Sequence, residues 1–242
     1  MGFINSWGNQ VRAESYSKLE FPNTYYLAYR DLPEIIAGHV RGNRAVDFGC
    51  GAGRSTRFLK KLGFEVIGID VALDMLKKAK EMDAEGNYQL VSNGSYSHIG
   101  AGKFDLVQSI FTFDNIPGWE SRTSILASLC DLLKPTGRMV VLDATPELYT
   151  NEWASFSTKA FPENWHAKTG DIVRDIMLDV EDRRPVEDIF WTEKDYLKQF
   201  GMAGLEIVAT YKPLGRDGEP FDWVTEKEIA PWMIFVLKKT KV

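Results

Sequence analysis

The stretch "AVDFGCGAGR", residues 45–54, places an acidic residue and three alternating glycines directly after a short apolar run. A glycine at the end of a strand permits a positive φ angle and lets a ligand approach the backbone closely. The helix that follows then points its free N-terminal amides toward that ligand. The stretch therefore predicts a bound ligand above the turn at 49–53.

Two phosphate-binding patterns fail in this stretch. A phosphate-cradling loop ends in Gly-Lys-Ser/Thr, but the chain continues Gly53-Arg54-Ser55 without a lysine. A dinucleotide fingerprint that begins at Gly49 and Gly51 requires a small residue at position 54, where the chain has Arg54. A dinucleotide oxidoreductase is therefore disfavoured.

The segments around the turn alternate between short apolar runs and amphipathic stretches, which favours a parallel sheet with right-handed crossovers. The expected strands are 44–49, 64–70, 88–93, 103–111 and 138–144, and the expected helices are 55–62, 73–80 and 121–133. Near the C-terminus a helix at 193–200, capped by Thr192, precedes strands at 204–211 and 232–239. The last two strands are joined by a turn, which suggests an antiparallel hairpin at one end of the sheet.

The regular alternation breaks at Pro146, and the next forty or so residues are rich in aromatic side chains. Within them, Thr169-Gly170-Asp171 is suited to cap a helix. Apolar residues follow at helical spacing at positions 172, 173, 176, 177 and 180. We therefore expect a helix here, inside an insertion between the fifth strand and the C-terminal elements.

The composition bears on partners and location. The chain has 242 residues, 44% of them hydrophobic, which suffices for one domain with a substantial core. Its formal net charge of -5 gives no general attraction to nucleic acid or to an anionic membrane surface. No apolar run approaches the ~20 residues that span a bilayer, and two cysteines are too few for a disulfide framework. We therefore expect a cytoplasmic protein, monomeric or homodimeric, with a small-molecule substrate and no nucleic-acid or membrane partner.

The pattern that fits the glycine turn throughout is Asp-x-Gly-x-Gly-x-Gly, from Asp47 to Gly53. With this motif the chain resembles the class I S-adenosylmethionine-dependent methyltransferases, which carry it after their first strand. The stretches "LLKPTGRMVVLDA" (132–144) and "APWMIFVLKK" (230–239) are similar to later parts of that family. The resemblance implies an α/β fold with a Rossmann-like, doubly wound, seven-stranded and mostly parallel sheet, which includes an antiparallel C-terminal hairpin strand.

The resemblance also implies one domain over 1–242. Its expected parts are an N-terminal helical lid at 1–43, a cofactor-binding core at 44–145, a substrate-side insertion at 146–187, and a C-terminal helix and hairpin at 188–242.

A second motif supports the same cofactor. Asp70 ends the second expected strand, "VIGID", and a carboxylate there can accept hydrogen bonds from both hydroxyls of a ribose. The implied cofactor, S-adenosylmethionine, has a ribose but no phosphate, so an acid in this place is tolerated. In the family an acid after the third strand meets the adenine amino group, whereas this chain has Asn93 there.

The resemblance implies a set of cofactor-binding residues that lie mostly at strand ends. They are Asp47, Gly49, Cys50, Gly51, Gly53, Asp70, Val71, Met75, Asn93, Gly94, Ser95, Ser109, Tyr16 and Tyr25. Several have a structural alternative: Asp47 can cap backbone amides of the turn, and Val71 and Met75 can belong to the core. Arg30 can pair with the cofactor carboxylate or be a surface charge.

The expected substrate side begins after the fourth strand and continues into the insertion. Its candidate residues are Asp114, Asn115, Trp153 and Trp165, and the candidate general bases are His98, His166 and Asp114. No metal site is expected. The implied activity is methyl transfer to an oxygen, nitrogen or carbon atom of a small molecule, and the alternative is a non-catalytic protein that binds S-adenosylmethionine.

Overall fold

The computed structural model describes residues 10–92, 94 and 96–240. These residues form a seven-stranded sheet in the order β3-β2-β1-β4-β5-β10-β9. The strands are β1 Arg44–Phe48, β2 Glu65–Asp70, β3 Asn87–Leu90, β4 Phe104–Ile110, β5 Leu133–Ala144, β9 Leu205–Tyr211 and β10 Trp232–Lys239. All neighbours pair in parallel except β10, which is antiparallel to both β5 and β9. The expected fold class is confirmed.

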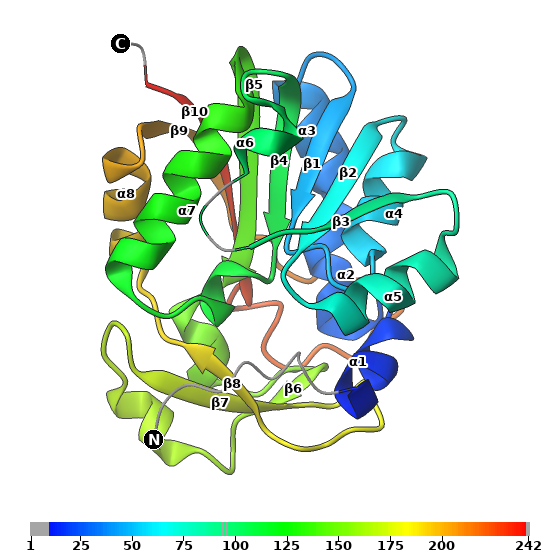
Figure 1. The fold of residues 1–242 in the computed structure, drawn as a ribbon. Coiled ribbons are helices and arrows are strands. Elements are labelled where there is room, and N and C mark those ends of the chain that lie inside the picture. The colour runs from blue at the N-terminus through cyan, green and yellow to red at the C-terminus, as the bar shows by residue number, and fades with distance from the viewer. Residues whose placement is uncertain (1–9, 93, 95, 241–242) are drawn as a thin grey trace.

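Helices cover both faces of this sheet (Figure 1). The helices are α1 Gln10–Ser17, α2 Asn23–Arg30, α3 Leu32–His39, α4 Arg54–Lys61, α5 Leu73–Met82, α6 Ser97–Gly100, α7 Trp119–Leu132 and α8 Glu193–Met202. Successive residues of β1 point to opposite faces of the sheet. Ala45 packs in the core that contains α2 and α3, and Val46 packs in the core that contains α7 and α8. A strand that is buried on both faces has a continuous run of apolar residues, and this explains the apolar run that precedes the glycine turn.

The order of the strands reverses between β1 and β4, since β1 leads outward to β2 and β4 leads outward to β5. In open parallel sheets a ligand binds at such a point, outside the carboxyl ends of the strands. The glycine turn after β1 lies there.

The insertion differs from the prediction in one element. The segment expected as a helix is the strand β7 Ile172–Met177, which pairs with β6 Phe156–Ser157 and β8 Val186–Ile189 in a separate antiparallel sheet. Val173, Asp175 and Met177 are buried in alternation, which is the period of a strand. The prediction of a helix was wrong because the carboxylate of Asp175 occupies a buried position and hides the two-residue period.

The small sheet lies across the carboxyl-end side of the large one, below β1 and β4 in Figure 1. Its strand β8 contacts the short 3-10 helix η2, Phe113–Asn115, which follows β4. Because β8 extends to Ile189, the small sheet continues past position 187, the expected end of the insertion. The insertion therefore lies beside the segment that follows β4.

Candidate active site

The turn after β1 needs its glycines for backbone geometry. Gly49, Gly51 and Gly53 have φ angles of 69°, 51° and 80°, in the left-handed region that favours glycine. A Cβ atom at Gly49 would also lie 2.3 Å from the side chain of Thr112, which follows β4. Only a glycine at position 49 therefore allows the turn to lie this close to the loop after β4.

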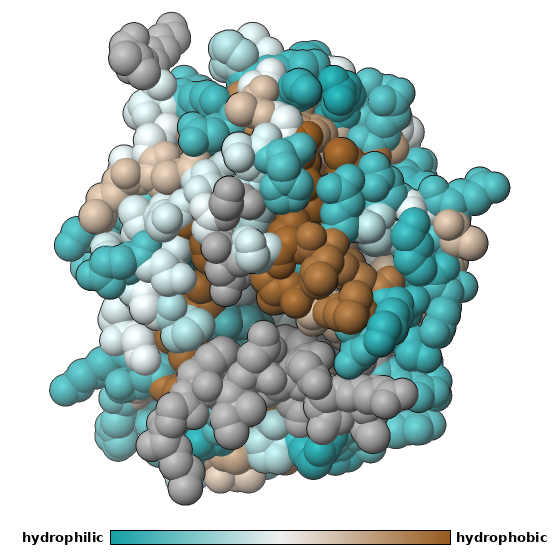
Figure 2. Space-filling model, viewed as in Figure 1, coloured by the Kyte–Doolittle hydropathy of each residue, from teal (hydrophilic) through white to brown (hydrophobic). Residues whose placement is uncertain are grey.

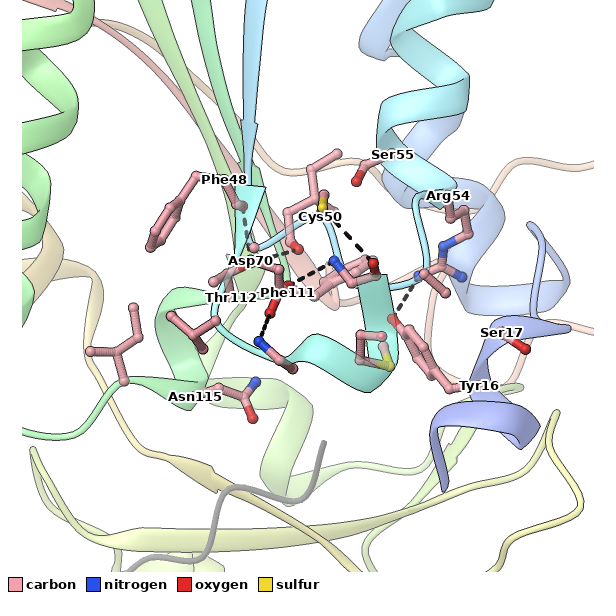
Figure 3. A pocket seen from close by; sticks show the side chains of 18 of the residues that line it. Tyr16, Ser17, Phe48, Cys50, Arg54, Ser55, Asp70, Phe111, Thr112 and Asn115 are labelled. Atoms are coloured by element: carbon pink, nitrogen blue, oxygen red, sulfur yellow. Dashed lines mark hydrogen bonds between the residues drawn. The ribbon is translucent and has the colours of Figure 1, made fainter. Parts of the chain in front are cut away.

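Asp70 holds this turn against the end of β2. Its Oδ2 accepts a 2.8 Å hydrogen bond from the Gly51 amide, and its Oδ1 accepts one of 2.8 Å from the Ala72 amide (Figure 3). Burial raises the pKa of the Asp70 carboxyl above its ordinary value, while these amide hydrogen bonds act in the opposite direction. Each oxygen uses one lone pair in this way, and a further lone pair stays available for a ligand hydroxyl.

A cavity of about 130 Å³ lies against the turn (Figure 3). Its walls come from α1, the ends of β1, β2 and β4, and the segments that follow them. The lining residues are Tyr16, Ser17, Tyr29, Phe48, Gly49, Cys50, Gly51, Ala52, Arg54, Ser55, Asp70, Val71, Ala72, Met75, Ile110, Phe111, Thr112, Asn115 and Ile116. We call it the first cavity.

Apolar side chains gather near the middle of the face that Figure 2 shows, over β3 and the start of α5. The exposed apolar residues of these segments include Val71, Leu73 and Leu90. Because Val71 also lines the first cavity, this apolar surface continues toward the cavity.

Arg54 is a site residue that the sequence analysis used only to exclude dinucleotides. It begins α4 and lines the first cavity, where its Nη2 donates a 2.8 Å hydrogen bond to the hydroxyl of Tyr16. Its Nη1 donates to the carbonyl oxygen of Glu20, and its guanidinium lies 5.0 Å from the ring centroid of Tyr25. The result is a buried cation that is surrounded by aromatic rings and lies beside the glycine turn.

Asp47 does not line the first cavity, and its expected contact with the cofactor stays a prediction. The side chain is fully buried and accepts hydrogen bonds from Ser55 Oγ at 2.7 Å and Thr56 Oγ1 at 2.6 Å. Burial raises the pKa of its carboxyl to about 6, opposed by these hydroxyls. Asp47 therefore fixes the start of α4 through side-chain hydroxyls, rather than through the backbone amides that its structural alternative named.

Gly53, Ser109 and Gly94 also lie outside the first cavity, although each was expected to bind the cofactor. The space beside Gly53 is filled by the ring of Tyr88, and Ser109 is buried within β4. Asn93 and Ser95 lie outside the described residues.

A second cavity adjoins the first, between the large and the small sheet. Its lining residues are Tyr16, Tyr25, Phe111, Asp114, Asn115, Ala144, Leu148, Phe156, Asp175, Met177, Val186, Asp188 and Trp232. The two cavities share Tyr16, Phe111 and Asn115 as a common wall. Tyr25 was expected at the cofactor and instead lines this second cavity, where Asp114 and Asn115 also lie.

Asp175 and Asp188 are further residues that the sequence analysis missed. They come from β7 and β8, and only the pairing of these strands brings them to the same cavity as Asp114. Burial raises the pKa of Asp114 to about 6 and that of Asp188 well above its ordinary value, and the charge of Asp114 adds to the shift of Asp188. In the sequence, these two acids could have been found as single acidic residues inside short apolar runs, "VRDIM" and "VEDIF".

The remaining candidates lie elsewhere. Trp153 is buried in the core and donates through Nε1 to the carbonyl of Leu148, whereas Trp165 is 67% exposed. His98 and His166 are exposed, and neither lines a cavity described above. His98 lies on α6 and His166 on the 3-10 helix Pro162–His166, and their role as candidate bases stays a prediction.

Arg30 forms ion pairs with Asp31 and Glu219 at 2.7 Å, so it does not pair with a ligand carboxylate at the first cavity. Within 10–92, 94 and 96–240, no group of three or more His, Cys, Asp or Glu side chains is arranged to hold a metal ion. No helix in the same described ranges is both long and apolar enough to cross a membrane.

The comparisons with known proteins agree with this geometry. Residues 46–141 match the family model described as "Methyltransferase domain". A "Ubiquinone biosynthesis O-methyltransferase" from Nitrosococcus oceani is 30% identical over 191 residues, which cover 75% of this chain and 73% of the relative. A protein of the same name from Methylococcus capsulatus is 33% identical over 110 residues, and there the match spans 45% of the relative.

Solved structures show the same fold. An S-adenosylmethionine-dependent methyltransferase from Clostridium acetobutylicum has a TM-score of 0.64 at 12% identity, with 96% of this chain and 98% of that chain covered. The CcbJ methyltransferase from Streptomyces caelestis has a TM-score of 0.68 at 18% identity, with 98% and 99% covered. With the glycine turn, the acid that ends β2 and the Nitrosococcus relative, these findings establish that the chain belongs to the class I S-adenosylmethionine-dependent methyltransferases of the small-molecule type, and S-adenosylmethionine is its cofactor.

Proposed function

We propose that S-adenosylmethionine binds in the first cavity and that its acceptor binds in the second. The observation that carries this proposal is the common wall of Tyr16, Phe111 and Asn115. A methyl donor and an acceptor must meet at one point, and two cavities that adjoin at the carboxyl ends of the strands supply such a point.

The residues of the first cavity fit this cofactor. Asp70 is suited to accept hydrogen bonds from the ribose hydroxyls, because its oxygens are already oriented by the amides of Gly51 and Ala72. Val71 and Met75 provide apolar surface for the adenine ring. The bare backbone at Gly49 and Gly51 leaves space for the methionine part.

Arg54 is the residue that we assign to the carboxylate of that methionine part. An arginine binds a carboxylate through two parallel N–H donors, and burial strengthens such a pair. Glu20 and Tyr16 each accept a hydrogen bond from the guanidinium, and Tyr29 is a further partner, so among the described residues these contacts do not use all five N–H donors. This places an anionic ligand group beside the start of α4, where the helix dipole also favours it.

When bound, the cofactor would supply a methyl group on a sulfonium ion: the acceptor atom bonds to the methyl carbon as the carbon–sulfur bond breaks, S-adenosylhomocysteine leaves, and the acceptor loses its proton to a base or to water. The chain therefore contributes mainly by positioning the acceptor, an effect that can reach roughly 7 to 11 kcal/mol. The buried aromatic walls of the second cavity, such as Phe156 and Trp232, exclude water from the acceptor. No fixed catalytic base is required when the acceptor atom is already nucleophilic.

A hydroxyl acceptor is the second candidate. The name of the relatives specifies O-methylation, and a hydroxyl needs a base to remove its proton. The buried carboxyl of Asp114, with a pKa raised to about 6, is suited to that task near neutral pH. In that case turnover rises with pH through about 6 and then levels off, as the fraction of ionised Asp114 increases.

Calorimetry of S-adenosylmethionine with the purified chain tests the assignment of the first cavity. We expect Asp70→Ala to weaken binding at least about tenfold, since it removes hydrogen bonds to a charged acceptor. Asp74→Ala is the matched control, because Asp74 is an exposed acid on α5 that pairs with Lys77. Equal affinities of both variants and the wild type would reject this placement of the cofactor. Release of S-adenosylhomocysteine with an extract of small metabolites reports the transfer itself.

We also propose that the chain acts in the cytoplasm as a monomer or homodimer. Cys50 and Cys130 are both buried free thiols, which fits a reducing compartment. Cell fractionation and light scattering test these two proposals, and a membrane-bound pool or a larger assembly would contradict them.

A further inference from the structure

We propose that Arg122 is a positioning residue for methyl transfer, and that it acts by holding the loop after β4, residues 111–116, in the shape that forms the wall between the two cavities. The inference rests on the proposed function, because the loop matters to the reaction only if cofactor and acceptor occupy these cavities. Its basis is a buried guanidinium on α7 that binds the loop from outside both cavities.

The loop after β4 contributes residues to both cavities. Phe111 and Asn115 line both of them, and Figure 3 shows these two residues with Thr112 at the first cavity. Asp114 lines the second cavity. A methyl donor and an acceptor react only within a narrow range of relative positions, so a displacement of this loop would alter the site of transfer.

The loop begins with a strained residue. The φ angle of Phe111 is 54°, in the left-handed region that a bulky residue rarely adopts. Such a conformation persists only where the surroundings impose it, and it concentrates at functional sites. The Phe111 amide donates a 2.9 Å hydrogen bond to the carbonyl of Leu142, and its ring centroid lies 4.7 Å from that of Trp232. Contacts from other elements therefore hold Phe111 at the wall of the two cavities.

The next two residues of the loop are bound by charged side chains of neighbouring elements. The Thr112 amide donates a 3.2 Å hydrogen bond to Oδ1 of Asp143, which is fully buried on β5. Arg122 Nη1 donates to the carbonyl oxygen of Phe113. Without the guanidinium, that carbonyl would keep only its 3.3 Å hydrogen bond from the amide of Ile116, which lies within the same loop. Arg122 is thus the contact that ties η2 to α7.

The surroundings of Arg122 keep its guanidinium in one place. The side chain is fully buried, and its Nε donates a 3.0 Å hydrogen bond to Oε1 of Gln199 on α8. The guanidinium carbon lies 4.3 Å and 4.8 Å from the ring centroids of Trp191 and Tyr196. Arg122 takes part in none of the ion pairs among the described residues. A buried charge without an ion pair is costly, and a core that needed only packing would be served by an apolar side chain.

A merely structural role makes a different prediction. If Arg122 only joins α7 to α8 through Gln199, its removal lowers the stability of the chain and leaves both cavities unchanged. If it holds the loop, the affinity for the cofactor changes as well, because Phe111, Thr112 and Asn115 line the first cavity.

Calorimetry of S-adenosylhomocysteine with the full chain tests the inference. Arg122→Met keeps most of the side-chain length and removes every donor. We expect it to weaken binding roughly 5- to 30-fold, the range for a residue that acts on a site without touching the ligand. Arg122→Gln keeps one N–H donor group without the charge, and it applies the same test with less disturbance of the buried polar contacts.

Two further variants separate positioning from stability. Arg122→Lys retains a charged donor, so we expect its affinity to recover to within about threefold of the wild type. Leu129→Ala is the matched control, because Leu129 is equally buried on α7 and lines neither cavity. We expect this control to lose stability and to change the affinity less than about twofold. Unchanged affinity in both Arg122→Met and Arg122→Gln, an equal loss in Leu129→Ala, or no recovery in Arg122→Lys would overturn the inference.

Fluorine NMR reports the loop itself. The chain is labelled with 4-fluorophenylalanine, and the resonance of Phe111 is assigned by its absence in Phe111→Leu. We expect this resonance to shift or broaden in Arg122→Met and to keep its wild-type position in Arg122→Lys and Leu129→Ala. A Phe111 resonance that is the same in Arg122→Met and the wild type would show that Arg122 does not hold the loop.

The cofactor measurement separates this inference from the proposed function. If Asp70→Ala weakens the binding of S-adenosylmethionine while Arg122→Met changes neither the affinity nor the Phe111 resonance, the proposed function stands and this inference fails. If Asp70→Ala leaves cofactor binding unchanged, the placement of the cofactor fails first.

Discussion

Arg54 and Tyr16 are joined by a 2.8 Å hydrogen bond from guanidinium to hydroxyl, which connects the first turn of α4 to α1 at the first cavity. Arg54→Met keeps most of the side-chain length and removes the charge. Because a hydrogen bond to a charged group contributes about 1.5 to 3 kcal/mol, we expect S-adenosylmethionine to bind roughly 10- to 100-fold more weakly. Calorimetry measures this change.

Tyr16→Phe is the control for that substitution. It removes the hydroxyl but keeps the ring that lies near the guanidinium. A loss as large as that of Arg54→Met would show that the link between α1 and α4 matters more than the charge, and no loss in either variant would contradict the assigned role of Arg54.

Gly49→Ala tests the packing of the glycine turn. An alanine there meets the left-handed φ of 69° and the side chain of Thr112 at 2.3 Å. Gly102→Ala is the matched control, because its φ is 65° and nothing lies within 4 Å of the added Cβ. We expect the control to lose about 1 to 2 kcal/mol of unfolding free energy from backbone strain, and Gly49→Ala to lose clearly more. Equal losses in chemical denaturation would show that Thr112 moves aside without cost.

Glu226 joins three distant segments although it is fully buried. Its Oε1 accepts hydrogen bonds from Thr24 Oγ1 at 2.6 Å and the Ala154 amide at 2.8 Å, and its Oε2 accepts from the amides of Val224 and Thr225. In Glu226→Gln an NH2 group replaces one carboxylate oxygen, so it faces the two hydrogen-bond donors that this oxygen accepted from. We therefore expect a loss of about 3 kcal/mol in unfolding free energy.

The exposed Glu228 provides the comparison for this position. Glu228→Gln is expected to change the unfolding free energy by less than about 0.5 kcal/mol. A Glu226→Gln variant as stable as Glu228→Gln would mean that the buried carboxylate does not hold α2 to the insertion.

Asp114 predicts a pH dependence of stability. Its folded pKa of about 6 lies above the ordinary value near 3.9, so the folded state binds the proton more tightly and loses stability as the pH rises from about 4 to 6. Asp114→Asn removes this loss. We therefore compare the free energy of unfolding of Asp114→Asn with that of the wild type. We expect the difference in favour of the variant to be about 2 kcal/mol larger near pH 7.5 than near pH 4.5.

The charged groups that face Asp114 come from several elements: Arg122 from α7, Asp143 from β5 and Asp188 from β8. Only Arg122 favours the ionised form, while the two acids oppose it. Thermal unfolding at both pH values measures the effect. A gain of equal size at both values would show that the carboxyl stays neutral, or stays charged, throughout.

The large sheet could be predicted because its information is local. Each apolar run that ends in a glycine or an acid, such as "VIGID" with Asp70, specifies a buried strand and a turn without reference to distant residues. The cofactor class was implied by the resemblance of the motif from Asp47 to Gly53, which lies within a single turn, to one family. The structure nevertheless assigns Asp47 to the support of the turn, since burial depends on neighbours that the motif does not contain.

The second cavity could not be predicted because its parts meet only in three dimensions. Asp175 and Asp188 are separated from Asp114 in the sequence, and the pairing of β7 with β8 brings them to η2. Asp175 also explains the error in secondary structure, because an acid on the buried face made a strand pattern resemble a helix pattern. Arg54 was visible in the sequence, but its contact with Tyr16 required the position of α1.

The common wall of the two cavities has a kinetic consequence. Tyr16 contacts both spaces, so a ligand that immobilises its ring in one space reduces the entropy that a ligand in the other must lose. With the proposed placement, we therefore expect cofactor and acceptor to increase each other's affinity by the same factor. In that placement, the spent cofactor shares this wall with the methylated product, so we expect each product to slow the departure of the other.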